Sequence, residues 1–234
     1  MGATIQCRGI EKTYYQGVVG VAALRGIDLD IESGDFATLA GPSGSGKTTL
    51  LSLIGGLDRP TAGHIAIEGE AIEHMEKNRL ADLRLHKIGF VFQSYSLIPV
   101  LSAIENVEFI LRLLHVPRPE RAARASEVLR EVGLAGLENR KPARLSGGQQ
   151  QRVAVARALA PRPSIVLADE PTANLDSKNA EELIALMGRL NSAWGTTFLI
   201  ATHDLRVIAH SRRRIEMIDG KIAADERRGA PIAA

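Results

Sequence analysis

The residues from Gly41 to Thr48 form a glycine-rich loop with the pattern G-x-x-x-x-G-K-[ST]. Its members are Gly41, Pro42, Ser43, Gly44, Ser45, Gly46, Lys47 and Thr48. Glycines let a backbone wrap tightly and turn its N–H groups inward, so the loop can cradle phosphate oxygens. Lys47 supplies a mobile positive charge for the β- and γ-phosphates, and the Thr48 hydroxyl can hold Mg²⁺. The loop therefore predicts a nucleoside triphosphate as the first ligand to consider.

Two acidic residues, Asp169 and Glu170, follow the apolar segment Ile165–Ala168. A buried strand can present carboxylates only at its end, where the crevice of a parallel sheet binds ligands. We expect Asp169 to hold Mg²⁺ through water, and Glu170 to orient and deprotonate an attacking water. Taken alone, the pair is weak evidence and is more typical of a turn after a strand. It becomes informative because a phosphate loop precedes it in the chain.

The segment from Leu145 to Gln149 predicts a second place where a helix begins beside an anion. Ser146 is typical of an N-cap, Gly147 and Gly148 expose backbone N–H groups, and a helix is expected from Gln149. The chain therefore has two phosphate-binding elements but only one triphosphate loop. This imbalance suggests a composite site built from two chains.

The elements that must position these residues follow from the hydrophobic pattern. Phe36–Ala40 predicts a buried strand that leads into the phosphate loop, and a helix from Thr49 directs its positive end at the phosphates. Further strands are expected at 5–15, 23–31, 64–67, 165–168 and 197–202, with a terminal hairpin at 214–218 and 221–223. Further helices are expected at 103–114, 119–132, 149–159 and 179–190.

This alternation indicates an α/β fold with a mostly parallel central sheet covered on both faces. We interpret residues 1–234 as one domain. A core with an N-terminal antiparallel β subdomain would comprise about 1–95 and 156–224, and the helical middle, about 96–155, would be an inserted subdomain. From Asp225 to the end we expect a short, charged and loose tail.

Composition excludes several classes of function. The 29 basic and 27 acidic residues give a net charge of +2, which is no signature of a nucleic-acid-binding protein. We expect the one basic triplet, Arg212 to Arg214, to be a solvated helix end or loop. A single cysteine, Cys7, leaves no internal disulfide and fits a reducing compartment. No apolar stretch approaches the ~18 residues needed to span a bilayer, so we expect a cytosolic chain whose membrane role depends on a partner.

Taken together, these motifs resemble those of the ATP-binding cassette (ABC) ATPases. Gly41–Thr48 matches the family's Walker A motif, Ile165–Glu170 its Walker B motif and Leu145–Gln149 its signature. Gln93 matches the Q-loop glutamine, Asp176 the D-loop aspartate and His203 the switch histidine. Tyr14 aligns with the aromatic residue that stacks on adenine, although adjacent Tyr15 leaves that register open. The resemblance covers roughly residues 4 to 223, in the family's order and approximate spacing.

The resemblance implies ATP and Mg²⁺ as cofactors and ATP hydrolysis as the reaction. In the family, two chains pair head to tail around two ATP molecules. Residues equivalent to Ser146 and Gly148 then complete the partner's site, and the equivalent of Asp176 links the two sites. The resemblance also assigns a role to each of the motif residues. The residues expected to take part in catalysis are Glu170, His203, Lys47 and Gln93, and those expected to bind the metal are Thr48, Gln93 and Asp169. Those expected to bind ATP include, in addition, Tyr14, the Gly41–Thr48 loop and Thr49. The partner chain would contribute its own Ser146, Gly147, Gly148, Gln149 and Asp176.

The segment from Ser96 to Val107 narrows the resemblance to the lipoprotein-releasing and macrolide-exporting (LolD/MacB-like) ATPases. This subgroup implies an integral membrane permease as a second partner and the export or release of a lipoprotein, lipid, peptide or drug. The chain would then lie on the cytoplasmic face of the cell membrane. Two alternatives are weighed: a cell-division regulator of the FtsE type, which Pro99 and Ala103–Asn106 disfavour, and a soluble ABC ATPase acting on ribosomes or nucleic acid. The second lacks support because the chain has no long coiled-coil insertion and no second cassette.

Overall fold

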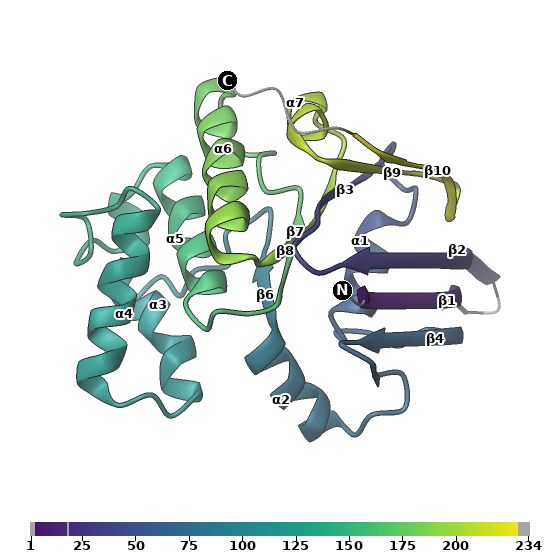
Figure 1. The fold of residues 1–234 in the computed structure, drawn as a ribbon, viewed down its shortest axis with the longest axis horizontal. Coiled ribbons are helices and arrows are strands. Elements are labelled where there is room, and N and C mark those ends of the chain that lie inside the picture. Colours follow the sequence, from purple (N-terminus) through teal and green to yellow (C-terminus); the bar gives the residue numbers. More distant parts are fainter. Residues whose placement is uncertain (1–2, 18, 229–234) are drawn as a thin grey trace.

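The computed structural model describes residues 3–17 and 19–228 (Figure 1). The elements follow the chain in a strand-rich first part, a helical middle and a final part in which strands and helices alternate. The bounds are β1 (Ala3–Gln16), β2 (Val19–Glu32), β3 (Phe36–Ala40), α1 (Lys47–Ile54), β4 (Ala62–Ile67), β5 (Glu70–Ala71), α2 (Lys77–Lys87), β6 (Ile88–Val91), α3 (Ala103–Leu113), α4 (Arg118–Glu131), the 3₁₀ turn η1 (Pro142–Arg144), α5 (Gly147–Leu159), β7 (Ile165–Asp169), α6 (Ser177–Trp194), β8 (Thr197–Thr202), α7 (Leu205–His210), β9 (Arg213–Ile218) and β10 (Lys221–Arg227).

The central sheet has the strand order β10-β9-β3-β8-β7-β6. Neighbouring strands from β9 to β6 run parallel, and only β10 pairs antiparallel, with β9. A second sheet, with the order β2-β1-β4-β5, is antiparallel throughout. The predicted α/β class, with a mostly parallel sheet and an N-terminal antiparallel sheet, is confirmed.

Strands β3, β7 and β8 of the central sheet are buried on both faces, which explains their continuous apolar sequences. In β7, Ile165 and Leu167 face the core shared with α1 and the antiparallel sheet, whereas Val166 and Ala168 face the core shared with α3 to α6. Successive side chains of a strand point to opposite faces, so one short strand contributes to both cores. The sheet is thereby fixed between two packed layers, and its carboxyl edge becomes a rigid support for loops.

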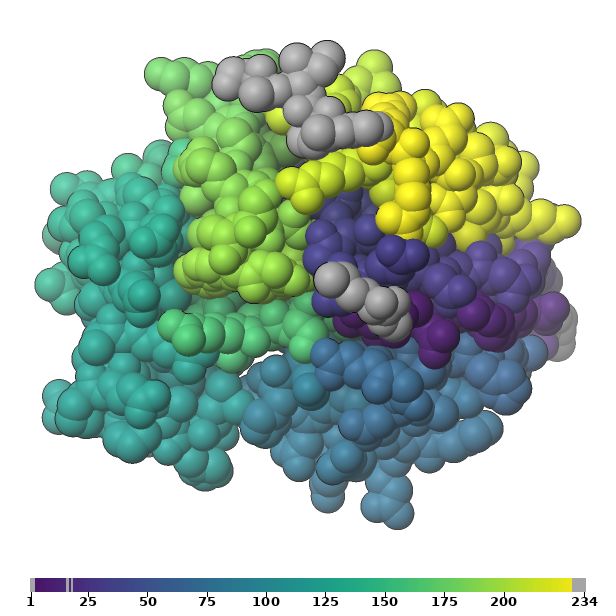
Figure 2. Space-filling view, viewed as in Figure 1, coloured from purple at the N-terminus to yellow at the C-terminus, as the bar shows by residue number. Residues whose placement is uncertain are grey.

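Helices α3, α4 and α5 lie together along one side of the molecule (Figure 1), and the same residues form the teal block in the space-filling view (Figure 2). Helix α3 begins with a capping box, in which the Ser102 hydroxyl accepts from the Glu105 N–H at 3.3 Å and the Glu105 carboxylate accepts from the Ser102 N–H at 2.7 Å. The predicted division into a core and an inserted helical subdomain stays a prediction.

Several element boundaries differ from those expected. Helix α1 begins at Lys47 and α5 at Gly147, each two residues earlier than predicted. The prediction omitted helices α2 and α7 altogether. Helix α2 buries only Leu80 and Leu83, and α7 has six residues, less than two turns. A helix that buries few apolar residues, or one that is as short as α7, leaves little periodic signal in the sequence.

The prediction that Arg212 to Arg214 form a solvated helix end or loop is wrong for Arg213. This residue lies in β9, and its side chain is 8% exposed. Its guanidinium donates to both carboxylate oxygens of Asp225, at 2.8 and 2.6 Å, and to Asp35 at 3.0 Å. The loose tail expected from Asp225 is likewise wrong for residues 225–227, because β10 continues to Arg227. The end of the expected tail, 229–234, lies outside the described residues.

Candidate nucleotide-binding site

The phosphate loop joins the carboxyl end of β3 to the first residue of α1. Gly46 adopts a φ of 99°, and a Cβ there would lie 2.7 Å from the carbonyl oxygen of Ala23. A residue with a side chain would therefore be strained and would also clash with the neighbouring sheet. The sequence pattern thus reflects a backbone that has to turn sharply while it lies against β2.

Two polar side chains in the loop are poised for an anion. The Lys47 ammonium donates to the carbonyl oxygens of Gly41 and Pro42, both at 2.8 Å, so it lies over the loop rather than in solvent. The Ser45 hydroxyl is buried and has no hydrogen-bond partner within the described part of the chain. A buried hydroxyl without a partner is costly. Phosphate oxygens in the loop would supply that partner and would attract Lys47, so these residues fit a bound phosphate chain.

Beside the phosphate loop, the carboxyl end of β7 meets the start of α1. The Thr48 hydroxyl donates to Asp169 Oδ1 at 3.0 Å. Burial raises the pKa of Asp169, and the neighbouring carboxylate of Glu170 adds to the increase, while Thr48 and Lys47 oppose it. Burial makes the ionised form of this carboxylate unfavourable, and a nearby cation would favour it. Its oxygen and the Thr48 hydroxyl are hard donors of the kind that Mg²⁺ prefers.

Glu170 occupies a backbone conformation that is unusual for its residue type. Its φ is 44°, in the left-handed region, and the following residue is Pro171. Non-glycine residues in this region cost of the order of 1–3 kcal/mol and tend to occur at functional sites. The backbone is held by a hydrogen bond from the Glu170 N–H to the Ala201 carbonyl at 2.9 Å. This turn directs the carboxylate toward the end of β8.

The Glu170 carboxylate is engaged by two neighbours from the end of β8. The Thr202 hydroxyl donates to Oε2 at 3.1 Å, and His203 Nδ1 lies 2.8 Å from Oε1. The carboxylate is largely buried, whereas the His203 ring is 67% exposed. Two of the predicted catalytic side chains are therefore in direct contact. The exposed ring can rotate toward a ligand at low cost, which would release one carboxylate oxygen.

The structure places Gln93 two residues beyond β6, as an exposed residue. Its carbonyl oxygen accepts a hydrogen bond from Asn174 Nδ2 at 2.9 Å, which links the segment after β6 to the segment after β7. The neighbouring Phe92 lines one small cavity with Thr48 and Asp169. Two of the three residues predicted to hold Mg²⁺, Thr48 and Asp169, are thus in contact, and Gln93 follows β6, the strand beside β7.

The signature segment forms a capped helix start, as predicted. The Ser146 hydroxyl accepts from the Gln149 N–H at 3.3 Å, and Gln149 Oε1 accepts from the Ser146 N–H at 3.0 Å. Gly148 lies so close to α6 that a Cβ would be 2.7 Å from Asn179 Oδ1, and Gly147 would place one 2.8 Å from the Tyr95 hydroxyl. In the described chain these residues contact α6 and the segment after Gln93. They do not join the phosphate loop.

Asp176 has a local structural role in this single chain. Its carboxylate accepts from the Asn179 N–H at 2.9 Å and from Asn179 Nδ2 at 2.7 Å, so it caps helix α6. The backbone and side chain of Asn179 lower the pKa of Asp176. The contact to a second site that the family resemblance implies would have to form in addition to this cap.

Of the two tyrosines in β1, Tyr14 is the one turned toward α1. Its hydroxyl donates to Asp58 Oδ2 at 3.0 Å, Lys12 Nζ lies 4.9 Å from the ring centroid, and the Thr49 side chain is near enough to lower the Tyr14 pKa. Burial and the Asp58 contact nevertheless raise that pKa overall. Tyr15 is 72% exposed. The geometry favours Tyr14 over Tyr15 beside a nucleotide, and stacking on adenine stays a prediction.

Sequence analysis missed several residues that hold the loops of the site together. Gln151, fully buried in α5, donates to the carbonyl oxygens of Pro171 at 2.9 Å and Phe92 at 3.4 Å. Arg157, also in α5, donates to the carbonyl of Ser96 at 2.5 Å and to that of Tyr95 at 3.1 Å. Burial lowers the pKa of Arg157. A polar residue one helical turn before Ala154 and Val155, on the apolar face of a helix, was the available signal for Gln151.

Known proteins resemble the chain over most of its length. An uncharacterized ABC transporter ATP-binding protein of Thermotoga maritima is 49% identical over 93% of each chain. The lipoprotein-releasing system ATP-binding protein LolD of Anaeromyxobacter dehalogenans is 46% identical over 95% of this chain and 93% of its own. The macrolide export ATP-binding/permease protein MacB of Sodalis glossinidius is also 46% identical over 95% of this chain, which spans only 34% of that longer protein.

Solved structures give the same result. The ATP-binding cassette MJ0796, in a dimeric post-hydrolysis state bound to ADP and Pi, has a TM-score of 0.89 and is 43% identical over 96% of this chain and 99% of its own. A further dimeric structure of the same bacterial ABC transporter cassette has a TM-score of 0.90. Within the described ranges, no helix combines the length and apolar character that crossing a membrane requires. The ABC transporter family model matches residues 24–173, so with these relatives the chain belongs to the ABC transporter family as an ATP-binding cassette.

Proposed function

We propose that this chain binds and hydrolyses ATP as the energising subunit of an ABC transporter. Two copies would close head to tail around two ATP molecules and drive a membrane permease that exports or releases a lipoprotein, lipid, peptide or drug. The observation that carries the proposal is the line of contacts along one edge of the sheet, from Thr48 to Asp169 and from Glu170 to His203. The relatives named LolD and MacB support the subgroup.

We assign each step of hydrolysis to a residue at the carboxyl edge of the central sheet. Lys47 would leave the two loop carbonyls and neutralise the β- and γ-phosphates. Thr48, Asp169 and Gln93 would hold Mg²⁺, which supplies charge neutralisation on the phosphate oxygens when bound. Glu170 would accept a proton from the attacking water, since its strained backbone aims the carboxylate at the end of β8. His203 would donate to the γ-phosphate once its ring turns from Glu170.

The second chain would complete the site through the signature. Ser146 is exposed, and the N–H groups at the start of α5 carry the partial positive charge of a helix N-terminus. This helix start contacts no phosphate loop within its own chain, as described above. A partner rotated by two-fold symmetry would present the same surface to the γ-phosphate of this chain, and this chain would do the same in return.

A cavity of about 600 Å³ offers a surface for the permease. It lies between α2 and β6 on one side and α3 and α5 on the other, with an apolar lining that includes Leu85, Phe90 and Leu113. Ser96 and Arg157 line it as well, so it borders the segment that Arg157 holds after Gln93. A permease helix in this cavity would thus contact a segment that reaches the nucleotide site. We expect Leu113→Glu to reduce permease binding and to leave ATP binding intact.

ATP-dependent dimerisation of Glu170→Gln protein tests the composite site. Glutamine keeps the size of the side chain but removes the base, so ATP should accumulate uncleaved and the closed dimer should persist in light-scattering chromatography. Glu181→Gln, an exposed change on α6, is the matched control and should hydrolyse ATP at the parent rate. A Glu170→Gln protein that binds ATP but stays monomeric, both alone and with its permease, would contradict the head-to-tail mechanism.

A membrane pull-down with the ATP-held Glu170→Gln protein tests the transport role. Mass spectrometry of the retained proteins should identify a permease with a large domain outside the cytoplasm, and capture should be lost in the Leu113→Glu background. Recovery of cell-division proteins or ribosomal proteins instead would refute the export or release role while leaving ATP hydrolysis untouched.

A further inference from the structure

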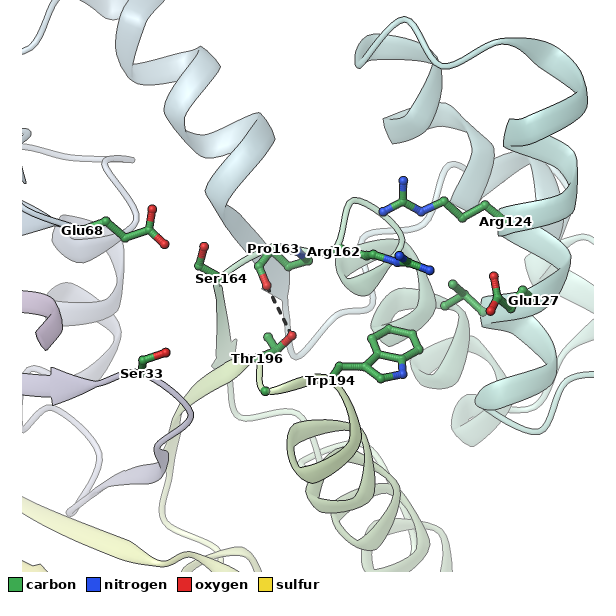
Figure 3. Close-up of a pocket in the computed structure, with 11 residues that line it drawn as sticks. Ser33, Glu68, Arg124, Glu127, Arg162, Pro163, Ser164, Trp194 and Thr196 are labelled. Carbon is green, nitrogen blue, oxygen red and sulfur yellow. Dashed lines mark hydrogen bonds between the residues drawn. The ribbon is translucent and has the colours of Figure 1, made fainter. Parts of the chain in front are cut away.

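A second cavity, of about 460 Å³, lies at the edge of the central sheet opposite the nucleotide site (Figure 3). Ser164 and Thr196, which line it, precede β7 and β8, whose other ends carry Asp169 and Thr202. A strand rises ~3.3 Å per residue, so the two sites are separated by roughly 15 Å of sheet. The proposed ATPase mechanism uses no residue of this cavity.

Two arginines from different elements meet in this cavity. Arg124 comes from α4 and Arg162 from the turn before β7, and their guanidinium groups lie in the same part of the close-up (Figure 3). Among the residues that the structure describes, neither guanidinium forms an ion pair or a hydrogen bond, and the Arg124 Nε is buried without a partner. A buried donor left unpaired costs of the order of 1–3 kcal/mol. Arg162 is exposed, so this cost falls on Arg124, and a bound anion would remove it.

The charges around the arginines leave this cost uncompensated. Burial and the nearby Arg162 lower the pKa of Arg124, and the carboxylates of Glu120 and Glu127 oppose this only in part. At the other end of the cavity, Glu68 is already engaged by Lys87 at 2.7 Å. At one end of the cavity, therefore, the two guanidinium groups form no ion pair among the described residues, although Glu127 also lines that end, whereas Glu68 at the other end is paired with Lys87.

Trp194 adds an apolar wall beside the arginines. It ends α6, lines the cavity and is 36% exposed, and Val128 of α4 lies in the same lining. A cavity of this volume is in the range of small-molecule sites, which combine apolar walls with a few polar groups that fix orientation. A flat organic group could lie along the indole, with hydroxyl groups of the ligand directed at Ser33 and Ser164.

We propose that this cavity binds a small organic phosphate monoester, with its phosphoryl group between Arg124 and Arg162 and its flat organic part against Trp194. Two guanidiniums match the roughly two negative charges of a monoester near neutral pH, and their N–H groups suit its oxygens. A monocarboxylate would satisfy only half of that charge. Because Arg124 lies in α4 and Arg162 in the turn that leads into β7, the bound ligand would join the helical layer to the edge of the central sheet.

Trp194 is the only tryptophan in the chain, so its fluorescence reports on this cavity directly. The probe is phenyl phosphate, titrated into Lys47→Ala protein so that the phosphate loop contributes little. We expect a saturable fluorescence change that weakens about tenfold or more in Arg124→Gln and in Arg162→Gln, as removal of a charge-assisted hydrogen bond implies. Arg130→Gln, an exposed change on the same helix, should bind like the parent.

Benzyl alcohol and benzoate serve as the neutral and singly charged comparisons and should bind more weakly than phenyl phosphate. Thermal unfolding of each variant verifies that it folds, and Arg124→Lys, which keeps the charge, should retain part of the affinity. The proposal is overturned if no saturable change occurs. It is also overturned if benzyl alcohol gives the same response, or if both glutamine variants bind phenyl phosphate as well as the parent does.

Discussion

Two substitutions of Ser146 should separate its role as a helix cap from its proposed role beside the partner's ATP. In Ser146→Ala the hydroxyl that accepts from Gln149 is lost, and loss of such a cap costs about 1 kcal/mol. For a chain of this length this corresponds to a melting temperature lower by about 2–4 °C. In Ser146→Asp the cap is retained, because aspartate accepts the same hydrogen bond at least as well as serine.

The aspartate variant should nevertheless fail at the composite site. A carboxylate about 4 Å from one phosphate charge is repelled by about 4 kcal/mol at an effective dielectric constant near 20. That energy corresponds to roughly a thousandfold weaker closure of the dimer. Ser146→Asp should therefore melt like the parent but neither dimerise with ATP nor hydrolyse it, whereas Ser146→Ala should melt earlier and keep measurable dimerisation.

The assay combines thermal unfolding without nucleotide and ATP-dependent dimerisation in the Glu170→Gln background. Ser126→Asp, which adds the same charge at an exposed position of α4, controls for a change in net charge and should dimerise normally. The reasoning is refuted if Ser146→Asp closes with ATP as tightly as the parent, because the helix start would then lie far from the partner's phosphates.

Three further outcomes follow from the site and its supports. Lys47→Ala should weaken ATP binding about a hundredfold or more in calorimetry, since truncating one side of a buried charge pair costs about 2–5 kcal/mol. Asp169→Asn should raise the melting temperature of the nucleotide-free protein at neutral pH. Because the pKa of Asp169 is raised in the folded protein, its ionised carboxylate destabilises the fold at pH values above that pKa. This destabilisation disappears as the pH falls through the raised pKa, so the gain in melting temperature should shrink in acid. Arg213→Met should destabilise the protein by about 3 kcal/mol in urea unfolding, because Asp225 loses its ionic partner and Asp35 keeps only Arg227, at 3.3 Å. Arg214→Met, which removes a partly exposed ion pair, should cost about 0–1 kcal/mol.

The fold was predictable from the sequence where a strong apolar pattern runs without interruption by turn residues. Strands β3, β7 and β8 are buried on both faces, so their apolar residues run without interruption in the sequence. Long-range ion pairs leave no such pattern. Arg213 is buried because Asp35 and Asp225 reach it from 178 and 12 residues away, and a basic triplet read by itself indicates a solvated surface.

The positions of the site residues were predictable because each follows a recognisable strand or begins a recognisable helix. Lys47 begins α1, Asp169 ends β7 and His203 follows β8. The contacts between these residues were harder to predict from the sequence, because they depend on the strand order. Only the placement of β7 beside β8 brings Glu170 to Thr202 and His203, and the parallel pairing aligns both strand ends at one edge.

The contacts between these loops explain how one nucleotide could influence distant parts of the chain. Asn174 joins the segment after β7 to Gln93, and Gln151 joins α5 to the carbonyls of Pro171 and Phe92. Thr172 donates to Asp204 at 3.2 Å, which ties the same segment to the residue after His203. Each loop is therefore bonded to at least one other, so none can move alone without breaking a hydrogen bond that is partly or fully buried. Movement of the carboxylate at Glu170 would thus be felt at the start of α5, which is where the proposed partner site lies.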